Sequence, residues 1–198
     1  MDVDAAPKTC KAIADHGAYW ADGMAPLPAT DHDILPAADV VIIGSGYTGM
    51  HAAIITARAG KVTQVLEAQT PGWGCSTRNG GQISSSVKPS LAELTKRFGA
   101  DRARAIRAEG TASLEWIESF ITDNGIDCDF RRNGRFHAAH TPQHFAALVR
   151  EAARLGDEEN VPTTVIQRQD QHKELGSDMY FGGVVFSRHA SLHPAKYY

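Results

Sequence analysis

The chain has 198 residues, of which 42% are hydrophobic and 22% charged, proportions that are ordinary for a globular protein and exclude a disordered one. Its net charge of -3, with Lys and Arg scattered along the sequence, predicts neither a nucleic-acid surface nor a membrane-surface footprint. The three cysteines are far apart, so they predict no disulfide framework and no metal site, and they favour a reducing cytoplasm. No signal peptide and no apolar run long enough to span a bilayer is found.

Residues 1–38 are rich in Ala, Pro and Asp, and their prolines prevent a long helix. We therefore expect an extended N-terminal arm over this range. Tyr19 and Trp20 are its only large aromatic pair, and we expect them to fix the arm to the body of the protein.

Residues 39–67 predict a strand, a glycine turn, a helix and a second strand. The run Val40–Ile43 is continuously apolar, which is typical of a strand covered on both faces by helices. A helix follows over 47–59, with apolar residues on one face, and Gly60 ends it. The strand over 61–66 is expected to lie parallel to the first, because such crossovers are right-handed.

The elements predicted after residue 67 are irregular at first and then alternate between helices and short strands. A loop over 68–88 comes first, followed by a helix from the Ser90 capping box to Gly99 and a helix over 101–124. Next we expect a hairpin of 128–132 and 135–139 around Asn133-Gly134, a helix from Thr141-Pro142 to Gly156 and a solvated acidic loop over 157–159. The last elements are a strand over 163–167, a short helix over 169–175, a strand over 180–186 and a helix start at His193-Pro194.

The spacing Gly44-x-Gly46-x-x-Gly49 between an apolar strand and a helix is the fingerprint of a dinucleotide site. Gly44 allows the tight turn, Gly46 lets the backbone approach a pyrophosphate, and Gly49 lets the helix pack close to the strand. The helix N-terminus then offers free N–H groups to the phosphates. Glu67 ends the second strand, where an acid accepts the ribose hydroxyls and repels a 2′-phosphate, so NADP is disfavoured.

The fingerprint alone does not distinguish NAD from FAD, but the segment 71–82 does. Its run Pro71-Gly72-Trp73-Gly74-Cys75-Ser76-Thr77-Arg78-Asn79-Gly80-Gly81-Gln82 resembles the flavin-contacting loop of the D-amino-acid-oxidase-like family of FAD-dependent oxidoreductases, and within it that of the gamma-glutamylputrescine oxidases. The likeness extends over nearly the whole chain, including Tyr180–Gly183 and Leu192–Tyr197. Arg78 brings positive charge that would stabilise a reduced, anionic flavin ring.

The resemblance implies that FAD is the cofactor and that the loop and the fingerprint bind it together. Ser76 and Thr77 would hydrogen-bond the pyrophosphate region, and residues 78–82 would run beside the flavin ring. The cofactor-binding residues predicted in this way are Gly44, Ser45, Gly46, Tyr47, Thr48, Gly49, Glu67, Ala68, Gly74, Ser76, Thr77, Arg78, Asn79, Gly80, Gly81 and Gln82.

The fold class that the resemblance implies is α/β, with an FAD-binding Rossmann-like βαβ domain and an interleaved α+β substrate domain. We expect an arm over 1–38, the FAD-binding segment over 39–90, the start of the substrate domain over 91–180 and a return toward the FAD domain over 181–198. With two parallel strands and a final helix of barely one turn, the chain reads as the truncated, amino-terminal part of a longer enzyme. Alone, it is expected to bind FAD weakly or not at all.

The implied function is oxidation of the C–N bond of an amine or amino acid, by hydride transfer to flavin N5, with dioxygen or another electron acceptor. No catalytic residue is named, because the resemblance implies none. Alternatives are an NAD-dependent dehydrogenase with the same fingerprint, and an incomplete flavoprotein that acts only by binding. A flavin monooxygenase would need a second, NADPH-binding fingerprint, which is not found in these residues.

Two further groups of residues attract attention. Cys75 lies in the flavin loop, and we expect a small packing residue there rather than a thioether link to flavin. His137, His140 and His144 are closely spaced, but no carboxylate or thiolate stands beside them, so we expect no metal.

Overall fold

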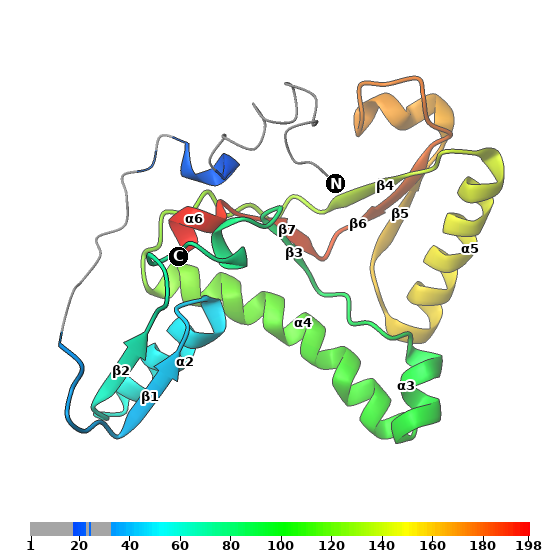
Figure 1. Cartoon of the computed structure of the whole chain (residues 1–198). Helices are drawn as coiled ribbons and strands as arrows, with labels where there is room; N and C mark the ends of the chain where they lie inside the picture. The colour runs from blue at the N-terminus through cyan, green and yellow to red at the C-terminus, as the bar shows by residue number, and fades with distance from the viewer. Residues whose placement is uncertain (1–17, 23, 25–32) are drawn as a thin grey trace, which may run out of the picture. The chain divides into compact units, whose positions relative to one another are not determined.

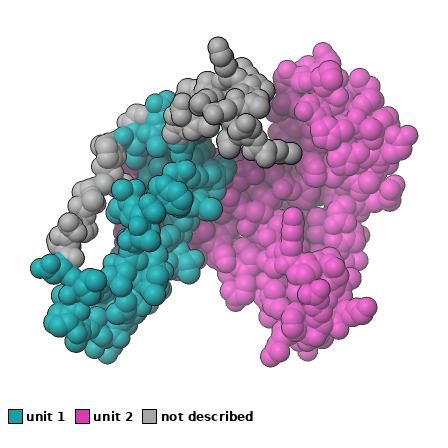
Figure 2. Space-filling view, viewed as in Figure 1, with its two compact units in different colours: residues 1–80, 193–198 teal, residues 81–192 magenta. Residues whose placement is uncertain are grey.

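The computed structural model describes residues 18–22, 24 and 33–198, so most of the predicted arm over 1–38 lies outside the described residues. The chain divides into two compact units, which Figure 2 colours separately. Unit 1 comprises residues 1–80 and 193–198, and unit 2 comprises residues 81–192. The predicted domain boundaries at residues 38, 90 and 180 stay a prediction.

Unit 1 is built on the predicted βαβ unit. Strands β1 (Val40–Ile43) and β2 (Thr63–Leu66) pair in parallel, and helix α2 (Tyr47–Arg58) connects them (Figure 1). Gly60, with a φ of +75°, follows the end of the helix as predicted. The remaining elements of unit 1 are η2 (Tyr19–Ala21), η3 (Cys75–Thr77) and α6 (Pro194–Tyr197).

The prediction that β1 is covered on both faces is wrong for the described residues. Val41 is 53% exposed and Ile43 is 88% exposed, whereas Val40 and Ile42 are half-buried. The reason is that α2 packs on one side of the two-stranded sheet, and no other described element of unit 1 covers the other side.

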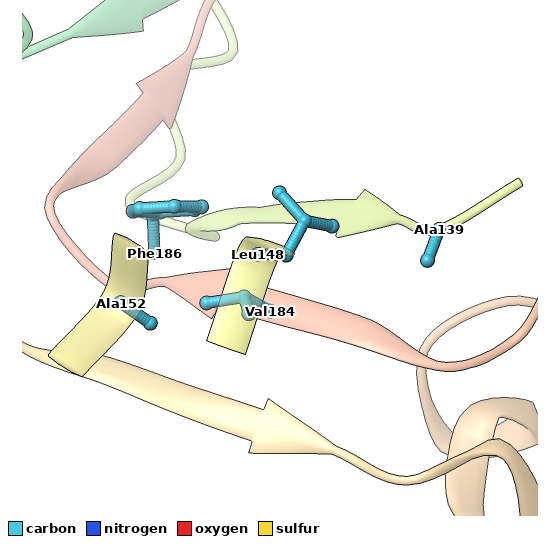
Figure 3. Close-up of a cluster of buried hydrophobic side chains, with 5 residues drawn as sticks. All are labelled: Ala139, Leu148, Ala152, Val184 and Phe186. Atoms are coloured by element: carbon cyan, nitrogen blue, oxygen red, sulfur yellow. The ribbon is translucent and has the colours of Figure 1, made fainter. Parts of the chain in front are cut away.

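Unit 2 has a three-stranded antiparallel sheet with β6 (Gly183–Phe186) between β4 (Arg135–Ala138) and β5 (Thr163–Ile166). Helix α5 (Pro142–Glu159) packs against it. Thr141 caps this helix by accepting a hydrogen bond from the N–H of His144. The buried cluster between helix and sheet, shown in Figure 3, consists of Ala139, Leu148, Ala152, Val184 and Phe186.

A second group of elements in unit 2 surrounds the long helix α4 (Ala100–Asp123). Helix α3 (Leu91–Phe98) precedes it and begins with the predicted capping box, in which Ser90 and Glu93 exchange hydrogen bonds. Strand β3 (Gln82–Ser84) pairs antiparallel with β7 (His189–Ser191), and η4 (Arg168–Lys173) is a 3-10 helix. The predicted loop over 68–88 therefore contains two short elements, η3 and β3.

The predicted hairpin around Asn133-Gly134 is wrong. A type I′ turn needs a positive φ at both central residues, and Gly134 has one (+69°) whereas Asn133 does not. Strand β4 pairs instead with β6, and Arg131 forms an isolated bridge with Ser191. Strand β6 is also shorter than the predicted strand over 180–186, and β7 was not predicted.

The prediction that α5 ends at Gly156 is also wrong. The helix continues to Glu159 and ends at Asn160, which adopts the left-handed conformation that terminates helices. The acidic run 157–159 is therefore the last turn of a helix and not a solvated loop. Glu159 is buried there because it pairs with Arg107 of α4, at 2.5 Å between carboxylate and guanidinium.

Candidate functional site in unit 1

The glycine turn brings β1 directly into α2. Gly44 has a φ of +92°, and its N–H donates to the carbonyl of Leu66 at 2.7 Å, so the turn begins at the end of the parallel ladder. A Cβ on Gly49 would lie 2.1 Å from the Gly44 carbonyl oxygen and 3.2 Å from the side chain of Ile42. A glycine at position 49 is therefore what allows the helix to lie this close to the strand.

The N-terminus of α2 offers backbone donors without a side-chain cap. Gly46 is the N-cap residue, and the first turn carries no acidic side chain. The N–H of Tyr47 donates to the Ser76 hydroxyl oxygen at 3.0 Å. Among the described residues, no acceptor takes a hydrogen bond from the N–H of Thr48 or of Gly49. These two donors and the positive end of the helix suit an anionic group such as a pyrophosphate.

Glu67, which follows β2, is held by the glycine turn. One carboxylate oxygen accepts hydrogen bonds from the N–H and the hydroxyl of Ser45, at 2.8 and 2.7 Å, and the other accepts from the N–H of Gln69 at 3.1 Å. The backbone N–H of Ser45, followed by its hydroxyl, lowers the pKa of Glu67 to about 2. The carboxylate is exposed and ionised, so it can accept further hydroxyl groups, as binding a ribose requires.

The Ser45 hydroxyl also accepts a hydrogen bond from the hydroxyl of Tyr198, the C-cap residue of α6, at 2.7 Å. A chain of hydrogen bonds thus runs from Tyr198 through the buried Ser45 to Glu67. Nothing in the sequence predicted the role of Tyr198, because 153 residues separate it from Ser45.

Side chains of the predicted flavin loop form hydrogen bonds with the loop's own backbone. The Thr77 hydroxyl donates to the Gly72 carbonyl oxygen, and the side-chain amide of Asn79 donates to the Ser76 carbonyl at 2.8 Å. The Arg78 guanidinium lies 5.1 Å from the centre of the Trp73 ring, which orients the cation by a cation–π contact. Trp73 was recognised in the sequence only as part of the loop, and not as the partner of Arg78.

Trp20 contacts the end of this loop and so fixes the described part of the arm to unit 1, as we expect from the sequence. Its indole N–H donates to the Asn79 carbonyl at 2.6 Å, and its ring packs edge-on against His193, the N-cap residue of α6. Tyr19 contacts the Trp20 ring but is 80% exposed, so Trp20 provides the attachment.

The structure therefore gathers the turn 44–49, Glu67 and Ser76 at the N-terminus of α2. Ala68 and Gly74 lie in the segments that follow β2 and precede η3, and Arg78 to Gly80 continue the loop. Gly81 and Gln82 belong to unit 2, where the Gly81 carbonyl accepts from the N–H of Leu192 and Gln82 pairs with Ser191.

The structure also shows where two weaker candidates lie. The predicted packing role of Cys75 is wrong, because this thiol is exposed. The rings of His137 and His140 lie 5.5 and 5.8 Å from that of His144. Among residues 18–22, 24 and 33–198, no group of three His, Cys, Asp or Glu residues is arranged to hold a metal ion.

A glycine turn between parallel strands, free N–H groups at a helix N-terminus and an anchored acid after the second strand define a dinucleotide-binding protein. The chain belongs to the family described as "DAO: FAD dependent oxidoreductase", whose profile matches residues 39–198. The expected family, fold class and cofactor, FAD, are thereby confirmed. No helix in the described part of the chain has the length and apolarity needed to cross a membrane.

Two curated relatives illustrate this membership. The chain is 33% identical to the gamma-glutamylputrescine oxidoreductase of Escherichia coli (strain K12) over 79% of its own length, and 30% identical to a probable oxidoreductase OrdL of Haemophilus influenzae over 87%. It spans only 36% and 39% of the lengths of these relatives.

Solved structures share the fold at lower identity. The L-amino acid deaminase of Proteus vulgaris superposes with a TM-score of 0.64 at 18% identity, over 86% of this chain and 43% of the other. The glycine oxidase of Geobacillus kaustophilus superposes with a TM-score of 0.60 at 17% identity, over 81% and 42%.

Proposed function

We propose that the protein to which these residues belong oxidises the C–N bond of an amine or amino acid, in the manner of gamma-glutamylputrescine oxidases. The observation that carries this proposal is the 33% identity to a gamma-glutamylputrescine oxidoreductase, together with a site whose donors and acid suit FAD. The family's dependence on FAD argues against the alternative of an NAD-dependent dehydrogenase.

The residues of unit 1 divide the work of holding the cofactor. The N–H groups of Thr48 and Gly49 would bind the pyrophosphate, and the ionised Glu67 would accept the ribose hydroxyls. Arg78, oriented by Trp73, would place positive charge beside the flavin ring. Bound FAD supplies the acceptor for the hydride that leaves the carbon next to the amine nitrogen.

The substrate's own chemistry sets one further condition. Its amine has to be neutral, because the nitrogen lone pair drives the loss of hydride from the neighbouring carbon. The oxidised product contains a C=N bond, which water hydrolyses to a carbonyl compound and an amine or ammonia. Dioxygen or another acceptor then takes the two electrons.

The binding of the cofactor is tested by the substitution Glu67→Gln, which keeps the shape of the side chain and removes its charge. The test uses a polypeptide of the relatives' full length that contains these residues. We expect the dissociation constant of FAD, measured by flavin fluorescence, to rise roughly tenfold, because a charge-assisted hydrogen bond to the ribose is lost. Glu109→Gln, on the surface of α4, is the matched control, and an equal effect of both substitutions would contradict the assignment.

The activity is tested on the same polypeptide by its absorbance spectrum and by hydrogen peroxide release, or reduction of an artificial electron acceptor, across a panel of polyamines and amino acids. We expect bound flavin and turnover with at least one amine. A protein that binds flavin but turns over none of these compounds would refute the proposed reaction. A colourless protein that requires NAD would refute the cofactor assignment as well.

A further inference from the structure

Unit 2 contains a cavity that the cofactor site does not use. Its volume is about 610 Å³, within the range of pockets that hold small organic molecules. All of its lining residues belong to unit 2. They come from α3 and α4, the C-terminal end of α5 and the residues after it, the residues after β3, and the segment from the end of β6 to the start of β7.

A buried histidine without a hydrogen-bond partner lines this cavity. His189 is 5% exposed, and no described residue bonds to its imidazole nitrogens. Among the described residues, every side-chain nitrogen or oxygen atom that is sealed from solvent has a hydrogen-bond partner. The imidazole nitrogens of His189 have no partner among these residues, so they must be accessible to solvent. Because His189 lines the cavity, we take them to open into it. A buried imidazole that is left open in this way indicates a ligand that supplies the missing hydrogen bonds.

The charged residues of the cavity fall into two groups. Arg104 pairs with Asp101, and Arg107 pairs with Glu159, so these two arginines are already neutralised. By contrast, Arg188 forms no ion pair or hydrogen bond through its guanidinium with any described residue.

The acidic groups of the cavity show the same division. Glu158 pairs with Arg154, whereas Glu115 and Asp157 have no ion-pair partner among the residues that the structure describes. One cation and two anions therefore remain available at the cavity, beside an open imidazole. Such a set is complementary to a molecule that carries both a carboxylate and an amine.

We propose that this cavity binds a small zwitterionic ligand of the amino-acid class, whose carboxylate contacts Arg188 and His189 and whose amine contacts Glu115 and Asp157. The neutral imidazole can donate one hydrogen bond to the carboxylate. Leu155 and Phe186 provide apolar surface for the carbon chain of the ligand. This site is argued from unit 2 alone and does not depend on the proposed oxidation reaction.

The test compares three probes of equal chain length by isothermal titration calorimetry with the 198-residue protein. The probes are 5-aminopentanoate, which carries one carboxylate and one amine, glutarate, which carries two carboxylates, and 1,5-diaminopentane, which carries two amines. We expect 5-aminopentanoate to bind most tightly. Absence of heat from 5-aminopentanoate at millimolar concentration, or equal binding of all three probes, would overturn the proposal.

Two substitutions then locate the bound probe. Arg188→Gln is expected to weaken 5-aminopentanoate binding about tenfold, and Glu115→Gln is expected to weaken 5-aminopentanoate without weakening glutarate. The matched control is Arg102→Gln, which removes an exposed cation from α4 outside the cavity. The thermal unfolding midpoint checks that each variant is folded. Unchanged binding in a folded Arg188→Gln protein would refute the site.

Discussion

Helix α4 packs close to the segment that follows β3 because Gly110 has no side chain. A Cβ at this position would lie 2.3 Å from the carbonyl oxygen of Ser85 and 2.6 Å from a methyl group of Val87. Because real Cβ atoms keep at least 3.0 Å, Gly110→Ala has to displace the backbone at Ser85 by at least about 0.7 Å. Overpacking of this kind costs about 3 kcal/mol, and the better helix propensity of alanine returns about 1 kcal/mol. The net loss of stability is therefore about 2 kcal/mol.

Gly156 provides the matched control, since it lies inside α5 of the same unit and a Cβ there would meet nothing within 4 Å. Gly156→Ala should therefore stabilise unit 2 by about 1 kcal/mol. The two alanine variants should differ by about 3 kcal/mol, which corresponds to roughly 10 °C in the unfolding midpoint measured by circular dichroism. Equal midpoints, or a gain of stability from Gly110→Ala, would refute the packing argument.

Two further predictions concern the charges of unit 2. Arg107→Gln should lower the free energy of unfolding, measured in urea, by about 3 kcal/mol, because it leaves the buried Glu159 without its main partner. Arg154→Gln, at a more exposed site, should lower it by under about 1 kcal/mol. Equal losses of stability in the two variants would contradict this reasoning. Burial is the main cause that lowers the pKa of His137 and of His189 below 6.5. The unfolded chain therefore takes up more protons than the folded one, and the free energy of unfolding should decrease as pH falls through 6.5. Replacing both histidines by Gln should reduce this dependence of the free energy of unfolding on pH.

Local patterns predicted the elements whose causes are local. The apolar run before Gly44 and the glycine spacing predicted β1, the turn and α2, because each depends on residues within one turn of structure. The capping box at Ser90 likewise predicted the start of α3, because its hydrogen bonds join residues three apart. The same local reading failed at Asn133-Gly134, where β4 pairs with a strand about fifty residues further along the chain.

The candidate site shows the same division between near and distant causes. The positions of Glu67 and the free N–H groups of α2 were predictable, because the βαβ unit alone brings them together within some twenty residues. The contact of Tyr198 with Ser45 and the position of the unbonded His189 imidazole at the cavity depend on segments far apart in sequence. No local residue pattern predicts either feature. The fingerprint together with the loop over 71–82 can therefore identify the cofactor of such a chain, whereas cavities assembled from distant segments become visible only in the folded structure.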